Sequence, residues 1–204
     1  MNSKGNLIVI SGPSGGGKGT VVKALKELMP DLGVSVSATT RSPRVGETDG
    51  VEYFFIGRDD FESMVKNGDI LEYTTYCGNY YGTPRKEAER ITGEGRDLIL
   101  EIEVDGAAQV KKIFPDAISI MLIPPSLSVL EARLRGRGTE SEDVIKKRLE
   151  RACEEIELAN TYDYVVVNED GGVYDCAHQI KRIIKADKSR TPRMKEIINN
   201  FTNK

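Results

Sequence analysis

A glycine-rich loop directly after an apolar run constrains this chain more than any other feature. The run "NLIVIS" spans Asn6–Ser11 and leads into "GPSGGGKGT" over Gly12–Thr20. The stretch Gly12–Lys18 fits the pattern G-x-x-x-x-G-K, and the residues that follow, Thr20–Met29, repeat apolar positions at helical spacing. A glycine run costs conformational entropy, so it is kept where a bare backbone is needed. Between a strand and a helix, such a loop turns successive N–H groups around phosphate oxygens, and the sequence therefore predicts a phosphate-binding loop.

The last residues of this loop indicate which groups would neutralise the charge of a bound phosphate. Lys18 provides a mobile positive charge for the β- and γ-phosphates of a nucleotide. The hydroxyl that usually follows the lysine and binds Mg²⁺ is replaced by Gly19, and Thr20 comes one residue later. A G-K-G-T ending resembles nucleoside monophosphate kinases, which implies that Mg²⁺ is held by phosphates and water with no direct protein ligand. The alternative, a glycine-rich turn with a surface lysine, is disfavoured by the flanking strand and helix.

Short apolar runs alternate with amphipathic stretches along the chain, which is typical of an α/β fold with a parallel sheet. We expect core strands at Asn6–Ser11, Gly33–Thr39, Asp97–Glu103, Ala117–Ile123 and Asp163–Asn168. We expect helices at Thr20–Met29, Asp105–Ile113, Leu127–Arg135, Glu142–Asn160 and Val173–Ala186.

Two segments interrupt this alternation. The first combines the aromatic runs "VEYFFIG" and "ILEYTTYCGNYYG" with the helical "RDDFESMVKNG", and the second is the arginine-rich "RLRGRGTESEDVIKKRL". We predict one domain over residues 1–204, with an inserted subdomain, a lid and a basic tail that forms either one short docked helix or a frayed terminus. The predicted parts are a core of 6–36, 97–126 and 160–186, the inserted subdomain 37–92, the lid region 127–159 and the tail 187–204.

Composition excludes several classes of function. The net charge of −3 gives no reason to propose nucleic acid or a membrane as the main partner. The N-terminus lacks the apolar segment of a signal peptide and no apolar run approaches a membrane span, so we expect a cytoplasmic protein. Cys77, Cys153 and Cys176 are far apart and lack metal-ligand spacing, which favours reduced thiols. The single histidine, His178, lies in a helical pattern and is expected to be incidental.

Polar residues in the inserted segment indicate a second anion site. Arg41 and Arg44 lie three residues apart among hydroxyl-bearing residues, an arrangement that suits a phosphate bound by charge-assisted hydrogen bonds. With these residues the chain resembles the guanylate kinase family, through "GPSGGGKGT", "TTRSPRVGE", "GNYYGT", "RLRGRGTES" and "VVVNED" in the family's order between Asn6 and Lys185. The resemblance implies a P-loop NTPase fold, with a five-stranded parallel sheet flanked by helices, an inserted GMP-binding subdomain and a lid. It also implies transfer of the γ-phosphoryl group of ATP to GMP.

The resemblance also implies roles for individual residues. ATP would be bound by Gly12, Pro13, Ser14, Gly15, Gly16, Gly17, Lys18, Gly19, Thr20 and Asn168. The GMP phosphate would be held by Arg41, Arg44, Tyr53 and Tyr81, and the guanine read by Ser37, Glu72 and Thr83. The catalytic residues would be Lys18, Arg41, Arg133, Arg137 and Arg148. Glu72 suits guanine because one carboxylate accepts both the N1–H and the 2-amino group, whereas N1 of adenine is itself an acceptor.

One stretch departs from the family pattern. The family usually has Asp-Ile-Asp, one residue, then Gln-Gly, whereas this chain has "EIEVDG" with Glu101, Glu103 and Asp105. Both glutamates end a predicted strand beside the phosphate loop, so each remains a candidate for contacting GMP or the water around Mg²⁺.

Two alternative functions remain open at this stage. One is an interaction module that keeps the fold without the activity, which the intact Lys18 and lid arginines disfavour. The other is a kinase for a different nucleoside monophosphate, which Glu72 and the tyrosine pair disfavour. The sequence makes no prediction about the oligomeric state.

Overall fold

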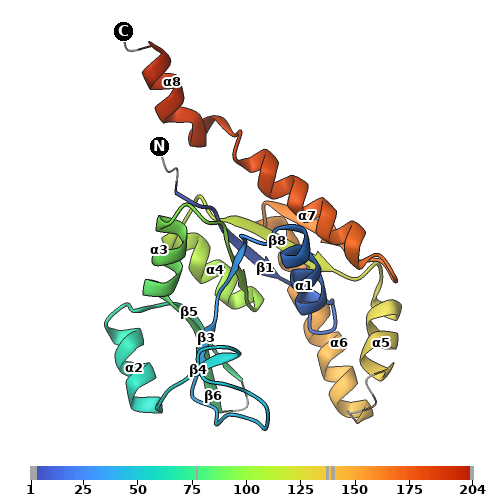
Figure 1. Cartoon of the computed structure of the whole chain (residues 1–204). Coiled ribbons are helices and arrows are strands. Elements are labelled where there is room, and N and C mark those ends of the chain that lie inside the picture. Colours follow the sequence, from blue (N-terminus) through green and yellow to red (C-terminus); the bar gives the residue numbers. More distant parts are fainter. Residues whose placement is uncertain (1–3, 77, 137, 139–140, 203–204) are drawn as a thin grey trace.

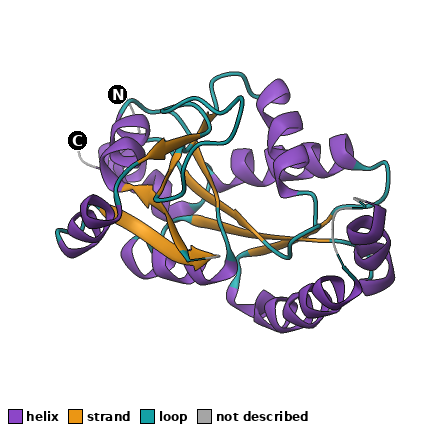
Figure 2. Cartoon of the chain, turned by 90° about the horizontal axis from the view of Figure 1, so that it is seen from below, coloured by secondary structure: helices purple, strands orange, loops and turns teal. Residues whose placement is uncertain are grey.

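The core of the protein is a parallel sheet. The computed structural model describes residues 4–202 except 77, 137, 139 and 140. In this part of the chain the core strands lie in the order β2-β7-β1-β8-β9, and every neighbouring pair is parallel. The strands are β1 (Leu7–Ser11), β2 (Gly33–Val34), β7 (Leu98–Glu101), β8 (Ile118–Ile123) and β9 (Tyr164–Val167). The five-stranded parallel sheet flanked by helices is confirmed (Figures 1 and 2).

Helices cover both faces of this sheet, and β1 shows why its sequence is continuously apolar. Ile8 and Ile10 pack in one core cluster with α1 (Lys18–Leu28) and α7 (Val173–Asp187). Leu7 and Val9 point to the opposite face, where they share a cluster with residues of α3 (Arg85–Gly93) and α4 (Val104–Ile113). A strand buried on both faces needs apolar residues at every position, so a run such as "LIVI" predicts a central parallel strand.

A second sheet forms the inserted subdomain. Its strands lie in the order β4-β3-β6-β5, with β3 parallel to β4 and the other pairs antiparallel. Its helix, α2, buries Phe61 completely in a small separate core with Ala38 and Ile70. Figure 1 shows this layer beside α4 at one end of the core sheet. The elements are β3 (Ser37–Thr39), β4 (Tyr53–Phe55), α2 (Arg58–Lys66), β5 (Ile70–Tyr76) and β6 (Asn79–Pro84).

Two local predictions are wrong here. The single strand expected over Gly33–Thr39 is two strands, because β2 pairs with β7 of the core sheet whereas β3 pairs with β4 and β6 of the second sheet. Apolar periodicity gives no sign of this change of partner. Helix α3 was not predicted, because it is mostly charged and only Ala88, Ile91 and Thr92 of its side chains are buried.

The C-terminal half adds helices at two sides of the core. The helix expected over Glu142–Asn160 is α6 (Glu142–Glu157) followed by a 3₁₀ turn (Leu158–Thr161), and α5 (Leu127–Gly136) precedes it. In the tail, a 3₁₀ turn (Thr191–Met194) leads into α8 (Lys195–Thr202), so the tail ends in a helix. Figure 1 shows α8 extending beyond the core sheet, and Phe201 is 89% exposed. Among the described residues, no helix has the length and apolar character needed to cross a membrane.

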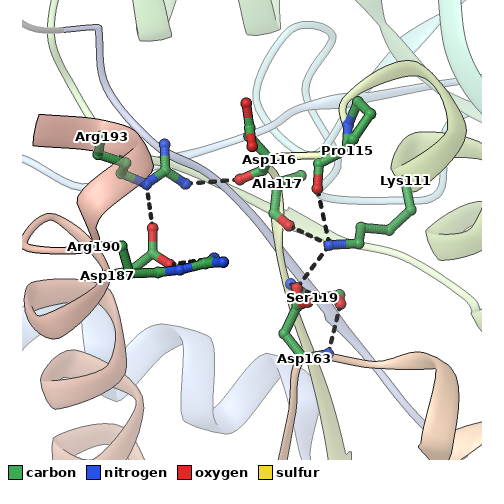
Figure 3. Close-up of polar contacts among 9 residues, drawn as sticks. All are labelled: Lys111, Pro115, Asp116, Ala117, Ser119, Asp163, Asp187, Arg190 and Arg193. Atoms are coloured by element: carbon green, nitrogen blue, oxygen red, sulfur yellow. Dashed lines mark hydrogen bonds and ion pairs between the residues drawn. The ribbon is translucent and has the colours of Figure 1, made fainter. Parts of the chain in front are cut away.

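Charged side chains join the N-terminal ends of the core strands to neighbouring segments (Figure 3). Asp163, just before β9, accepts hydrogen bonds from Lys111 Nζ and from the backbone N–H and hydroxyl of Ser119, each at 2.8 Å. Asp187 is fully buried and pairs with Arg190 and Arg193. Arg193 in turn donates to the backbone carbonyl of Asp116 at 2.7 Å. The contacts of Asp163 join the start of β9 to α4 and β8. Those of Arg193 join the end of α7 and the start of the tail to the segment before β8, at the edge of the sheet opposite the phosphate loop.

Asp163→Ala tests the first of these contacts. Partial burial alone raises the pKa of Asp163, but the hydrogen bonds from Lys111 and Ser119 outweigh it and hold the pKa below its usual value. A lowered pKa contributes stability above the unfolded-state pKa that is lost as the pH falls through the folded-state pKa. We therefore expect Asp163→Ala to lower the free energy of unfolding by about 2 kcal/mol at neutral pH, and by less below about pH 4.

Urea unfolding at the two pH values measures this difference, with the exposed Asp31→Ala as the control variant. A loss that is the same at both pH values would contradict the role given to the charge of Asp163.

Candidate active site

The phosphate loop joins β1 to α1 as the sequence predicts. Gly12 has φ of 141° and Gly17 has φ of 92°, conformations that favour glycine. A Cβ atom on Gly12 would lie 2.1 Å from the Leu122 carbonyl oxygen, and one on Gly17 would lie 2.4 Å from Asn168 Nδ2. Lys18 begins α1 and donates from Nζ to the Gly12 carbonyl oxygen at 2.5 Å. The loop thus leaves no room for side chains at Gly12 and Gly17. The hydrogen bond from Lys18 connects the end of the loop to its beginning.

Asn168 and Arg133 lie behind this loop. Asn168 follows β9, is 3% exposed, and donates from Nδ2 to the Gly16 carbonyl oxygen at 2.9 Å. Arg133 donates to the Asn168 carbonyl oxygen at 2.8 Å and pairs with Asp170 at 2.6 Å. The structure therefore does not bring these two predicted residues into the cleft described next. Arg137, also predicted, lies outside the described residues.

A cleft of about 620 Å³ opens between the phosphate loop, the second sheet and α6. Thr83 lies behind it and donates its hydroxyl to Glu72 Oε1 at 2.7 Å. The cleft therefore brings the phosphate loop together with the residues predicted to hold a second nucleotide. The predicted residues that line it are Ser14, Lys18, Ser37, Arg41, Arg44, Tyr53, Glu72, Tyr81, Glu101, Glu103 and Arg148.

A fixed cation marks one end of the cleft. Arg41 pairs through both terminal nitrogens with Glu47, at 2.8 and 2.9 Å, and Glu47 also accepts the Arg44 backbone N–H at 2.7 Å. The guanidinium of Arg41 lies over the rings of Tyr53 and Phe55, 5.4 and 5.6 Å from their centroids. The hydrogen bond from Arg41 lowers the pKa of Glu47 to about 2. The bidentate pair therefore stays ionised over the physiological range and holds the guanidinium in one orientation.

A buried carboxyl group lies in the wall of the cleft. Glu72 on β5 is 4% exposed. Burial raises its pKa to about 7, against the opposing effect of the hydrogen bonds from Thr83. Ionised Glu72 is therefore costly in the free protein, because only neutral donors face it. A ligand that offers N–H groups to this carboxylate would recover part of that cost.

Two further carboxylates, Glu101 and Glu103, lie at the end of β7 and just after it, beside the loop. A Cβ atom on Gly19 would lie 3.5 Å from Glu101 Oε1, so this carboxylate lies against the start of α1. Glu103 is the residue before α4. In the described part of the chain, no three His, Cys, Asp or Glu side chains are grouped as ligands for a metal. The single carboxylate of Glu101 beside the start of α1 fits a Mg²⁺ ion that is contacted through water.

Two cleft residues on α6 were not predicted. Arg151 and Glu155 line the cleft beside Arg148, which donates to the Ser14 hydroxyl at 3.2 Å. Arg151 Nε donates to Glu155 Oε1 at 2.9 Å, and burial raises the pKa of Glu155. The three residues are spaced at i, i+3 and i+7, which places them on one helical face. Once Arg148 was assigned to the site, this spacing could have identified the other two.

Known proteins resemble this chain along nearly its whole length. The family model of guanylate kinase matches residues 4–187. A guanylate kinase of Streptococcus thermophilus strain CNRZ 1066 is 51% identical over 195 residues, covering 95% of this chain and 92% of the relative. One of Carboxydothermus hydrogenoformans is 46% identical over 191 residues, covering 94% and 93%. The crystal structure of guanylate kinase from Anaplasma phagocytophilum has a TM-score of 0.74 at 35% identity, covering 94% of this chain and 90% of that one.

Glu72→Gln tests the cost of the buried charge in the ligand-free protein. Because the folded-state pKa of about 7 is raised, folding holds a proton on Glu72 that the unfolded chain releases near its ordinary pKa. This group therefore destabilises the fold as the pH rises through that interval. We expect Glu72→Gln to increase the free energy of unfolding at about pH 8, by up to about 3 kcal/mol, and to change it little near about pH 4.5. Urea unfolding without nucleotide measures both values, and a variant that is less stable than the wild type at the higher pH would contradict this reading.

Proposed function

Because the chain belongs to the guanylate kinase family, we propose that it transfers the γ-phosphoryl group of ATP to GMP, reversibly, giving ADP and GDP. One observation carries the proposal: a single cleft joins a phosphate loop to a sheet that bears a fixed guanidinium and a buried carboxylate. These are the groups that two nucleotides need when the acceptor is a purine monophosphate with N–H donors on its base. The reaction belongs to purine nucleotide metabolism and the recycling of GMP.

The phosphate of GMP is assigned to the fixed-cation end of the cleft. Arg41 is already oriented by Glu47 and by the aromatic rings beneath it, so little ordering remains to be done on binding. Arg44, Tyr53 and Tyr81 line the same region and would complete the phosphate site. The rings of Tyr53 and Tyr81 meet edge to face at 5.9 Å, which keeps both side chains in place.

The guanine is assigned to Glu72, with Thr83 and Ser37 beside it. The N1–H and 2-amino groups of guanine would both donate to the carboxylate, which favours its ionised form and lowers its pKa on binding. Adenine would present the N1 lone pair to the same oxygens and leave the buried carboxylate without donors. Glu72 is therefore the residue proposed to set the choice of base.

ATP is assigned to the phosphate loop, with Asn168 on the side of its adenine. Lys18 would exchange the Gly12 carbonyl for the β- and γ-phosphates, and Arg148 would approach them from α6. The proposed catalytic role of Arg133 requires its side chain to turn toward the phosphates and leave Asp170. Arg137 keeps the catalytic role predicted from the sequence. The phosphate of GMP is already anionic, so positioning and charge neutralisation carry the transfer without a general base.

Mg²⁺ is proposed to enter with ATP. When bound, it would neutralise charge on the phosphate oxygens. Thr20 in the first turn of α1 and Glu101 beside that turn are the side chains we assign to its water shell. Glu103 is assigned to GMP because it lines the same cleft as Glu72.

The remaining proposals concern organisation. We assign residues 37–92 to a GMP-binding subdomain and 127–159 to a lid, which would close over the two nucleotides and exclude water. The substrates proposed are ATP and GMP, with neither nucleic acid nor a membrane as a partner. Since both nucleotides are cytoplasmic metabolites, the reaction is assigned to the cytoplasm.

A coupled assay that follows ADP formation tests the function directly. We expect phosphoryl transfer from ATP with GMP as the acceptor and far less with AMP or UMP. The variant Lys18→Met removes the loop's cation, and we expect it to lower kcat by at least about 100-fold while calorimetry shows GMP binding close to that of the wild type. Wild-type protein that binds both nucleotides but transfers no phosphoryl group would instead support the interaction module.

Glu72→Gln tests the reading of the base. The amide keeps the shape of the side chain but turns an NH₂ group toward one guanine donor, so GMP should lose about 2–4 kcal/mol in kcat/KM. AMP should lose little, since an amide can donate to its N1, and the KM for ATP should be unchanged because ATP binds elsewhere. Kinetics with both acceptors provide the measurement, and an intact preference for GMP in the variant would assign base recognition to other residues.

A further inference from the structure

Helix α4 touches the carboxylate assigned to guanine through a glycine. A Cβ atom on Gly106 would lie 2.4 Å from Glu72 Oε2 and 3.1 Å from Glu72 Cδ, closer than real Cβ atoms approach oxygen. Gly106 has no left-handed backbone conformation, so its backbone would accept any residue. The three atoms nearest to such a Cβ all belong to Glu72, so the carboxylate packed against Gly106 accounts for the glycine.

The same helix also holds the strand that carries Glu72. Gln109 Oε1 accepts the Tyr73 backbone N–H at 3.2 Å, and Gln109 Nε2 donates to the Tyr73 carbonyl oxygen at 3.0 Å. The side-chain amide of Gln109 therefore satisfies both backbone hydrogen-bonding groups of Tyr73, as a neighbouring strand would. Gly106 and Gln109 are three residues apart and lie on one face of α4.

Pairing within the second sheet leaves Glu72 less constrained than its neighbours. The register between β5 and β6 shifts between Ile70 and Tyr73, so Glu72 lies within the irregular stretch. The carboxylate of Glu72 is held by the hydroxyl and the backbone N–H of Thr83 and packs against Gly106 of α4. Gln109 of the same helix holds the backbone of the next residue, Tyr73.

Helix α4 also begins at the phosphate loop's edge of the core sheet. It follows Glu103 directly after β7, and β7 pairs with β1 through Glu101 and Ile10. Through its contact with Glu72, α4 therefore holds the proposed base site in a fixed position relative to β1 and β7, and the phosphate loop follows β1.

We propose that Gly106 and Gln109 are positioning residues for base recognition, which place the Glu72 carboxylate where it meets the N1–H and 2-amino edge of a guanine nucleotide. This inference rests on the proposed function and adds to it the element that fixes the specificity residue. The two residues act through Glu72 and contact no substrate themselves.

Gly106→Ala is the principal test. Alanine stabilises a helix relative to glycine by about 0.5–1 kcal/mol, so the variant should fold, and the end of the Glu72 side chain is the group that must move. We expect the KM for GMP to rise at least about tenfold and the GMP-to-AMP ratio of kcat/KM to fall, with the KM for ATP within about twofold of the wild type. The matched control is Gly93→Ala in α3, where an added Cβ meets nothing within 4 Å. The control should keep wild-type kinetics.

Gln109→Leu is the second variant, because it removes both hydrogen bonds to Tyr73 at similar volume. It should lower the GMP-to-AMP ratio in the same direction, so the inference stays testable if Gly106→Ala fails to fold. Thermal unfolding of all variants separates lost specificity from lost structure. A folded Gly106→Ala or Gln109→Leu protein with wild-type KM for GMP and wild-type preference would overturn the inference and leave the proposed function intact. A wild-type protein that phosphorylates no GMP would overturn both.

Discussion

The pairing of β1 with β7 and β8 is the constraint on which the site depends. β1 is buried on both faces and parallel to both neighbours, so the carboxyl ends of these strands lie at one edge of the sheet. The phosphate loop leaves β1 at that edge, and Gly12 and Gly17 pass so close to Leu122 and Asn168 that a side chain at either glycine would collide with them. Every other site residue is positioned relative to this edge.

The carboxylates of this protein differ in the partners that stabilise their charge. Asp187 is fully buried but paired with two arginines. Asp163 is more exposed and receives three donors. Glu72 is almost as buried as Asp187, yet the hydrogen bonds that it accepts come from the neutral hydroxyl and backbone N–H of Thr83. A buried charge that lacks a charged partner costs stability, and such costs concentrate at functional sites. The contrast with Asp187 supports the proposal that Glu72 is kept for binding a ligand.

The sequence predicts those features that depend on residues close together in the chain. The phosphate loop follows from spacing within Gly12–Lys18, and the core strands follow from runs buried on both faces. A feature that depends on the choice of partner was missed: β2 and β3 follow one another in one expected strand but join different sheets. The pairing of Arg133 with Asp170 in the ligand-free protein was likewise not readable from the sequence, and its role toward phosphates stays a prediction. Periodicity defines a face, whereas the residue that meets this face is determined by tertiary packing. For Arg151 and Glu155, the sequence predicts that both lie on one helical face with Arg148, but it does not predict that this face lines the cleft.

The contacts of α4 also determine which wall of the cleft is free to move. β5 packs on α4 and is tied to it through Gln109, whereas β4 and α2 make no comparable contact with the described core elements. Any closure of the second sheet would therefore pivot near β5, close to Glu72. Arg41 and Tyr53, which lie toward the β3–β4 side of that sheet, would travel farther than Glu72 does. Under the proposed assignments, such a pivot would leave the base site nearly stationary while the motion brought the phosphate of GMP toward the loop. Base specificity and closure would then depend on different strands of the same sheet.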